Sequence, residues 1–395
     1  MRACAACLRR SRLLAEVSPE IDRRFRGRRV PGILAMDDER LAATLGRHGR
    51  ARPDALDLGD EELLQRARAL RAAHRTDAIC RHDPEFPARL STIDDPPALL
   101  YVRDDAGRLV DALAGRPSVA IVGSRQASDE AREMARRLGA DLASAGVVVV
   151  SGMAFGVDAA AHDGALTVHG GSGRGSATDA ADGVDGAPSG PGRTVAILGG
   201  GPERSSPARL SRLYERIVRH GVVASELPPG TTPRPWTFPA RNRLLAGLVD
   251  LVVVVAARPG SGSLITAGLV LSDAAGDRLA VVPGSTTDPR CAGSNALLRE
   301  PGVTAVLDAS DVLARLPARP GGDPGTFRPS TTRDPLAGLD GDGLRLARCL
   351  LDGPRTLESI VDDLDAVRVL AGLAELEAAG RLRRSVDGAL VLDVA

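Results

Sequence analysis

Short apolar runs alternate with longer amphipathic segments through the middle of the chain. Runs of this kind that are rich in valine are typical of strands buried on both faces of a sheet. Strands that alternate with helices favour a parallel, doubly wound α/β sheet. The predicted strands are Ser118–Val122, Val147–Val150, Val195–Leu198, Val222–Ala224, Leu251–Val255 and Leu279–Val282.

The two ends of the chain lack this alternation of strands and helices. Residues 1–85 are rich in Arg and Ala with helical spacing, which predicts an N-terminal helical domain. Residues 339–395 predict three helices and a β-hairpin, the order of a winged helix. The helices are expected at Leu344–Leu351, Thr356–Leu364 and Ala366–Ala379, and the strands around Leu382 and at Leu390–Leu392. This module is acidic, so we interpret it as a protein contact or regulatory element more readily than as a DNA reader.

Two stretches have little apolar content. Residues 169–193 are rich in Gly, Ser, Asp and Ala and predict a disordered insertion, and residues 317–338 predict a linker. The expected domains are therefore 1–85, 86–316 and 339–395, with the linker before the last.

Composition narrows the possible ligands. The chain has 51 basic and 51 acidic residues and a formal net charge of zero, so a nucleic-acid site must be a local patch. Every basic residue is Arg, which excludes a P-loop lysine, and no GxGxxG follows the first strand, which argues against NAD or FAD. We expect no cofactor. The absence of a signal-like or membrane-length apolar segment predicts a cytoplasmic protein with no membrane partner.

The segment from Phe238 to Arg243 reads Phe-Pro-Ala-Arg-Asn-Arg. Arginines bind phosphates, and an aromatic face can stack a base, so Phe238, Arg241, Asn242 and Arg243 predict a site for single-stranded nucleic acid. The alternative is an exposed loop in which Phe238 fills the core and the arginines are solvated.

Other polar loops follow the predicted strands. Ligands of open parallel sheets bind beyond the carboxyl ends of the strands. Gly123, Ser124 and Arg125 follow the first strand, and Ser151–Asp158 follows the second. Ser261, Gly262 and Ser263 open a later helix. Together these loops predict one phosphate-binding edge.

Catalytic and metal-ligating groups are hard to find. Asp158 and His162 share a helix face, and structural roles suit them better than catalysis. Cys4 and Cys7 form half of a possible zinc site that Cys80 and His82 could complete. The long separation and unusual spacing weigh against it, so we expect no metal.

In this order, the loops resemble those of the DNA-processing protein A family, also called DprA or Smf. The matching motifs are His82–Leu90, Asp95–Tyr101, Val122–Arg125, Ser151–His162, Ser225–Gly230, Phe238–Leu248, Ser261–Thr266 and Val282–Gly284. The resemblance implies a Rossmann-like domain that binds single-stranded DNA, forms a homodimer and loads the RecA recombinase without catalysis. This activity would serve natural transformation and homologous recombination.

The resemblance also implies roles for individual residues. Arg125, Arg241 and Arg243 would hold phosphates and Phe238 would contact a base. Gly123 and Ser124 would add backbone and hydroxyl contacts, and Ser261, Gly262 and Ser263 would line the same pocket. The chain departs from the family at Ala256, where a Glu is usual, at Ser206-Pro207, and in the insertion.

Two other hypotheses remain open. The fold is also similar to that of nucleotide phosphoribohydrolases, but Pro283–Thr287 has no Glu after it until Glu300. In a third reading, residues 339–395 carry the activity and the rest is a scaffold.

Overall fold

The computed structural model describes residues 2–25, 32–46, 53–167, 194–272, 276–317, 341–350, 356–361, 365–378, 381–384 and 389–392. The chain divides into two compact units, Met1–Phe327 and Arg328–Ala395. The predicted insertion and nearly all of the predicted linker lie outside the described residues.

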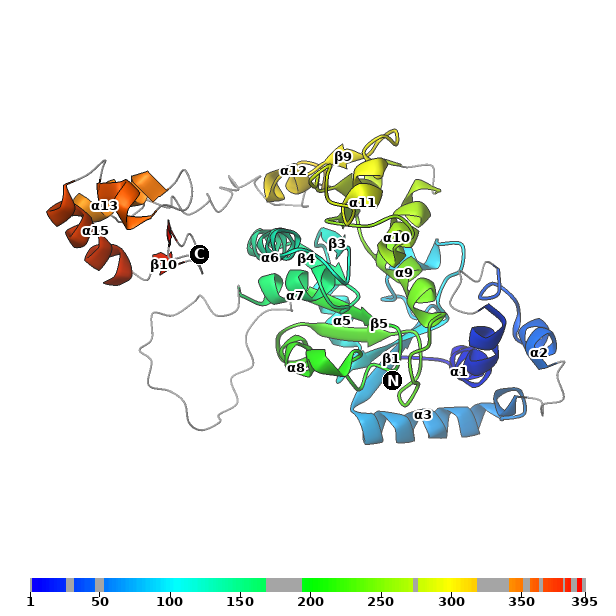
Figure 1. The fold of residues 1–395 in the computed structure, drawn as a ribbon. Helices are drawn as coiled ribbons and strands as arrows, with labels where there is room; N and C mark the ends of the chain where they lie inside the picture. Colours follow the sequence, from blue (N-terminus) through cyan, green and yellow to red (C-terminus); the bar gives the residue numbers. More distant parts are fainter. Residues whose placement is uncertain are drawn as a thin grey trace, which may run out of the picture. The chain divides into compact units, whose positions relative to one another are not determined.

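The first unit is built on a nine-stranded sheet with the order β1-β2-β6-β5-β4-β3-β7-β8-β9 (Figure 1). From β6 to β9 all neighbours are parallel, whereas β2 pairs antiparallel with both β1 and β6. The predicted parallel α/β sheet is confirmed; β1, β2 and β9 were not predicted. The strands are β1 Thr76–Cys80, β2 Leu99–Arg103, β3 Ser118–Val122, β4 Val148–Ser151, β5 Thr194–Leu198, β6 Val222–Ser225, β7 Leu251–Val254, β8 Leu279–Val281 and β9 Thr304–Ala305.

Helices cover both faces of this sheet. Ala120 and Val122 of β3 pack in a core with α4, α5, α9 and α10, while Val119 and Ile121 pack with α6, α7 and α12. The central strands are apolar except for a Ser or Thr at one end of some of them, because both of their faces are buried. The helices are α4 Ala88–Ser91, α5 Gly107–Leu113, α6 Asp129–Ser144, α7 Val157–Thr167, α8 Ser211–His220, α9 Thr237–Leu248, α10 Gly262–Leu271, α11 Ala292–Leu297 and α12 Ala309–Leu313.

The order of the strands creates a topological switch point. From β3 the chain proceeds outward through β4, β5 and β6, then returns to the other side of β3 for β7, β8 and β9. Connections leaving β3 and β7 therefore diverge, and a crevice opens beyond their carboxyl ends.

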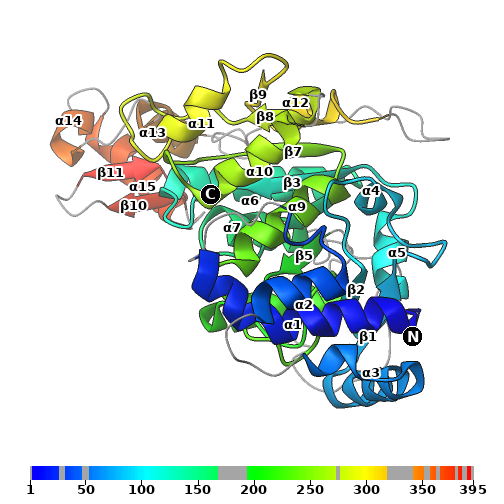
Figure 2. The same ribbon diagram turned by 90° about the vertical axis from the view of Figure 1, so that its right-hand side faces the viewer.

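The N-terminal helices α1 Ala5–Phe25, α2 Asp38–Gly46 and α3 Asp60–His74 lie near β1 and β2 (Figure 2). Leu13, Ile21 and Leu41 form a core with Trp236, whose Nε1 donates a hydrogen bond to Ser18 Oγ (2.9 Å). The predicted boundary at residue 85 falls after β1, which is part of the sheet. Among the described residues, every helix is too short or too polar to serve as a membrane span.

The second unit has three helices followed by two antiparallel strands. Leu346, Val369, Leu376 and Leu390 are among its core residues. The order agrees with the predicted elements, and a winged helix remains our interpretation of it. The elements are α13 Gly341–Leu350, α14 Leu357–Val361, α15 Ala366–Ala378, β10 Leu382–Arg384 and β11 Leu390–Leu392.

Candidate nucleic-acid interface

A cavity of about 610 Å³ lies beyond the carboxyl ends of β3, β4 and β7. Its walls come from the loops after these strands and from the first turns of α9 and α10. The cavity is lined by most of the predicted site residues: Gly123, Ser124, Arg125, Phe238, Arg241, Asn242, Ser261, Gly262 and Ser263.

Arg125 and Phe238 form the accessible pair of the cavity. The Arg125 guanidinium carbon lies 5.1 Å from the centroid of the Phe238 ring, within the range of a cation–π interaction. Arg125 is exposed and Phe238 is half-buried. Gly199 supports the ring from behind, because a Cβ there would lie 3.1 Å from Phe238 Cδ1. A cation and an aromatic ring are thus held together where a ligand enters.

Arg241 lies deeper and is only 5% exposed. Its Nη1 donates hydrogen bonds to the carbonyl oxygens of Gly152 (2.7 Å) and Ile197. Burial lowers the pKa of Arg241 to about 10, so the side chain still carries its charge at neutral pH. Its Nη2 makes no hydrogen bond to the described part of the chain, although the residue lines the cavity. The positive charge of Arg241 therefore adds to the field of the cavity.

Asp158 is the buried carboxylate beside this arginine. It accepts hydrogen bonds from the N–H groups of Gly152 (3.2 Å) and Ala154 (3.3 Å) in the preceding loop. Burial raises the pKa of Asp158, while the charge of Arg241 favours its ionised form. The carboxylate therefore fixes the β4–α7 loop, in agreement with the structural role expected near a helix start.

His162 is fully buried one turn further along α7. Thr194 Oγ1 donates to the Val149 carbonyl oxygen (2.9 Å), so it accepts from His162 Nδ1 over 2.7 Å. Burial, assisted by the charge of Arg241, lowers the pKa of His162 to about 3. The imidazole is neutral at physiological pH. Its Nδ1 is paired locally, as expected, whereas its buried Nε2 has no hydrogen-bond partner among the described residues.

The β4–α7 loop has an unusual backbone. Met153 has φ of +56°, an uncommon conformation for a residue with a side chain, and such conformations cluster at functional sites. Gly156 has φ of +79°, and a Cβ there would lie 2.2 Å from the Ser124 carbonyl oxygen. Only glycine allows this loop to pack against the loop that carries Arg125.

The start of α10 forms the opposite wall. Ser261 Oγ and Ser263 Oγ are 2.6 Å apart, and Asn242 Nδ2 donates to the Gly262 carbonyl oxygen (3.0 Å). Asn242 therefore holds α9 against the start of α10. The start of a helix offers backbone N–H groups and a partial positive charge, both of which suit an anion.

Arg258 is a cavity residue that the sequence interpretation missed. It is exposed and lies in the loop between β7 and α10. The sequence could have identified it, because Arg258 follows the predicted strand Leu251–Val255 just as Arg125 follows Ser118–Val122.

Arg243 lies outside this cavity, so the structure does not bring together the three arginines that were expected to share one site. The predicted loop Phe238–Arg243 is instead the beginning of α9, and two residues of a helix are rotated by about 200°. Arg243 binds both carboxylate oxygens of Glu226 (2.6 and 2.8 Å) and the Asp95 carbonyl oxygen (2.8 Å). Its guanidinium therefore links α9 to the segments that contain Asp95 and Glu226.

Ala256 stands where the family usually has a Glu. The residue is buried, and its carbonyl oxygen accepts a hydrogen bond from the Ser124 N–H (2.7 Å). Its backbone thus connects the end of β7 to the loop after β3.

Comparison with known proteins agrees with this architecture. The family model for DNA recombination-mediator protein A matches residues 77–317. The chain is 31% identical to the DNA processing protein DprA of Bacillus subtilis, over 60% of this chain and 69% of that protein. It is 38% identical to a putative DNA processing protein DprA of Mycobacterium tuberculosis, over 52% of this chain and 46% of that protein. The solved structure of DprA from Streptococcus pneumoniae aligns with 80% of this chain and 100% of its own, with a TM-score of 0.55 and 28% identity. The chain therefore belongs to the DNA recombination-mediator protein A family.

Proposed function

We propose that the cavity beyond β3 and β7 binds single-stranded DNA, and that the protein uses it as a non-enzymatic recombination mediator. The observation that carries this proposal is the Arg125–Phe238 pair at 5.1 Å, held above the buried charge of Arg241. Single-strand sites combine cationic contacts to the backbone with aromatic faces for bases.

The charge of the cavity suits a polyanion. Three arginines, Arg125, Arg241 and Arg258, line it against one carboxylate, Asp158. The chain has no net charge, so this excess is local. The helix start at Ser261–Ser263 adds backbone donors to the same wall. Such a site binds phosphates without reading base edges, which predicts low sequence preference.

The lining argues against catalysis. Among the described lining residues, no His or Cys is present, and Asp158 is engaged by two backbone N–H groups. A nucleophile needs a base within hydrogen-bond reach, and the hydroxyl groups of Ser261 and Ser263 bond only to each other among the described residues. The site is built to bind and release.

Membership of a recombination-mediator family supports the further steps. We propose that the DNA-bound protein loads the RecA recombinase onto the strand in the cytoplasm, during transformation and homologous recombination. We also propose that it acts as a homodimer through its Rossmann-like domain.

The test begins with fluorescence anisotropy of labelled single-stranded and double-stranded oligonucleotides of several sequences. We expect preferential binding of single strands, little dependence on sequence, and no release of free base from nucleotide monophosphates. RecA loading is then measured as the rate of filament formation on strands coated with single-strand binding protein. Absent binding to oligonucleotides together with hydrolysis of nucleotides would replace the proposal with the small-nucleotide hypothesis.

A further inference from the structure

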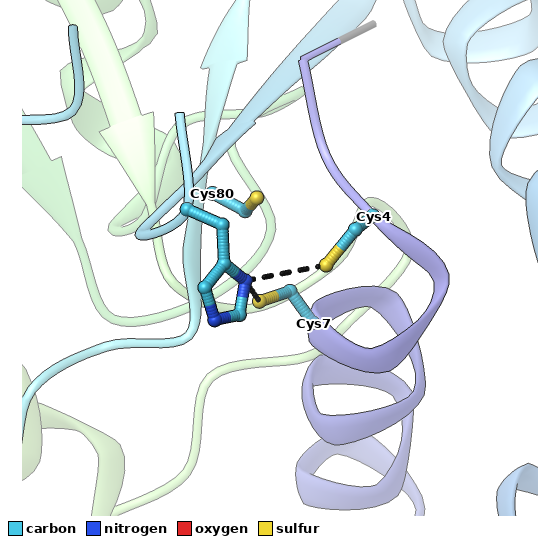
Figure 3. Close-up of side chains that lie close together, drawn as sticks. Cys4, Cys7 and Cys80 are labelled. Atoms are coloured by element: carbon cyan, nitrogen blue, oxygen red, sulfur yellow. Dashed lines mark hydrogen bonds between the residues drawn. The ribbon is translucent and has the colours of Figure 1, made fainter. Parts of the chain in front are cut away.

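Four potential metal ligands gather where the N-terminus meets the sheet. The ligand atoms of Cys4, Cys7, Cys80 and His82 all lie within 4.8 Å of one another. Cys4 Sγ and Cys7 Sγ are each 3.4 Å from His82 Nδ1. Figure 3 shows the three labelled cysteines converging from the start of α1 and the end of β1. None of these residues takes part in the proposed DNA site.

A backbone bridge overcomes the long separation in sequence that weighed against this site. Arg2 pairs with Ile79 in a parallel bridge, through its N–H to the Ala78 carbonyl (2.8 Å) and its carbonyl to the Cys80 N–H (3.0 Å). The Arg2 guanidinium also binds both carboxylate oxygens of Asp83 (3.0 Å each). Arg2 is therefore joined to residues that precede His82 (Ala78 and Cys80) and to one that follows it (Asp83).

Local structure then directs the side chains. Cys4 immediately precedes α1 and Cys7 lies in its first turn, so the two thiols, three residues apart, lie on the same face. Cys80 ends β1, and His82 lies in the turn that follows. Two short motifs, Cys-x-x-Cys and Cys-x-His, thus face one another.

Two sulfur–nitrogen distances in the cluster fit the ligands of a tetrahedral ion. Zinc bonds of about 2.3 Å to sulfur and 2.0–2.1 Å to nitrogen place tetrahedral ligands about 3.6 Å (S to N) and 3.8 Å (S to S) apart. The distances from Cys4 Sγ and Cys7 Sγ to His82 Nδ1 are both 3.4 Å, close to the expected sulfur–nitrogen separation. Cys7 and Cys80 are buried among Leu8, Leu99 and Tyr101, which shields the inner side of the cluster from water.

We propose that Cys4, Cys7, Cys80 and His82 bind one structural zinc ion, which fastens the start of α1 to the end of β1. Three thiolates and one imidazole form a closed set of four ligands, typical of structural and not catalytic zinc. Sulfur and nitrogen donors in tetrahedral arrangement also disfavour magnesium and calcium, which prefer oxygen ligands.

Elemental analysis of the full-length protein, purified without a histidine tag or chelator, tests this proposal. We expect about one zinc per chain. Cys80→Ser should lose the metal, whereas Cys291→Ser and Cys349→Ser, which alter the two cysteines outside the cluster, should retain it. Equal zinc content in all variants, or substoichiometric zinc in the wild type, would overturn the assignment.

Two further measurements remain decisive if Cys80→Ser does not fold. His82→Cys supplies a fourth thiolate and should keep the metal, whereas His82→Ala should bind it more weakly. Cobalt added to metal-free wild type should give the intense visible absorption of a tetrahedral thiolate site. Absence of that absorption, or a mass lower by two hydrogens that reports a disulfide among these cysteines, would contradict the proposal.

Discussion

The cavity beyond β3 and β7 and the Cys/His cluster at the end of β1 use polar side chains in opposite ways. In the cavity, Arg125 is exposed and Arg241 keeps one nitrogen free of bonds within the described chain. In the cluster, four ligand atoms point at one another within 4.8 Å, two of them from buried residues. Polar groups without a partner in the described chain suit a ligand that binds and leaves, whereas four ligand atoms that face one another suit a permanently bound ion.

Substitutions in the two regions should also affect different quantities, namely DNA affinity and folding stability. A ligand of the cavity is absent from the free protein, so cavity substitutions should change affinity more than folding. A bound zinc ion stabilises the native state because the unfolded chain lacks the preformed site.

The largest expected effect comes from removing zinc. Free zinc at about 1,000 times its dissociation constant would stabilise the fold by roughly 4 kcal/mol. Chelation should therefore lower the melting temperature, with recovery on adding zinc, while the DNA affinity of the remaining folded protein stays unchanged. Thermal unfolding of Cys349→Ser with and without chelator provides the control. A chelator that leaves the melting temperature of the wild type unaltered would remove the proposed stabilisation.

Arg243→Ala should cost about 3 kcal/mol of folding stability, since it leaves Glu226 charged in a mostly buried position. Denaturant unfolding measures this loss. The double variant Arg243→Ala/Glu226→Ala should recover part of it, because no unpaired charge remains. Both variants should bind single strands with wild-type affinity once folded. A selective loss of DNA affinity at full stability would return Arg243 to the binding site.

Phe238→Ala should weaken single-strand binding by ~1–3 kcal/mol, the usual worth of one base–aromatic stack. Phe238→Tyr keeps an aromatic face and should bind like the wild type. Anisotropy titrations of both variants give the comparison. Equal weakening by alanine and tyrosine would show that the ring supports the fold of the cavity and does not stack a base.

His162 should make stability depend on pH in a defined direction. Its pKa is about 3 when folded against 6.5 as the ordinary value, so its contribution is complete above pH 6.5 and is lost as pH falls towards 3. At pH 5.5 the expected loss is about 1 kcal/mol. His162→Asn, which can still donate to Thr194, should show a smaller loss than wild type when both are saturated with zinc. Identical pH profiles for the two proteins would contradict this role.

The sequence predicts what depends on local pattern. Apolar runs identify the central parallel strands, and the rule that ligands bind beyond their carboxyl ends groups Arg125, Phe238 and Ser261 from the sequence alone. Arg243 was expected beside Arg241 because the segment was interpreted as a loop, but α9 already begins at Thr237 and places the two side chains about 200° apart around the helix. The helical phase depends on where the first turn starts, which Pro239 alone does not determine.

Non-local pairing explains the other omissions. β1 and β2 are antiparallel strands outside the repeating strand–helix pattern, and their pairing brings Cys80 towards the N-terminus. The bridge between Arg2 and Ile79 has no signature in either segment. The long separation in sequence therefore did not predict that Cys4, Cys7, Cys80 and His82 lie close together.

The most direct test of the central claim is the salt dependence of single-strand affinity in matched arginine variants. Arg125→Ala should weaken binding and reduce the slope of log affinity against log salt by about 0.7, the value for one lost phosphate contact on a single strand. Arg66→Ala removes an exposed charge on α3, which pairs with Glu62 outside the cavity, and should leave both affinity and slope unchanged. The same slope in both variants, or a loss confined to Arg66→Ala, would place the DNA elsewhere and contradict the account.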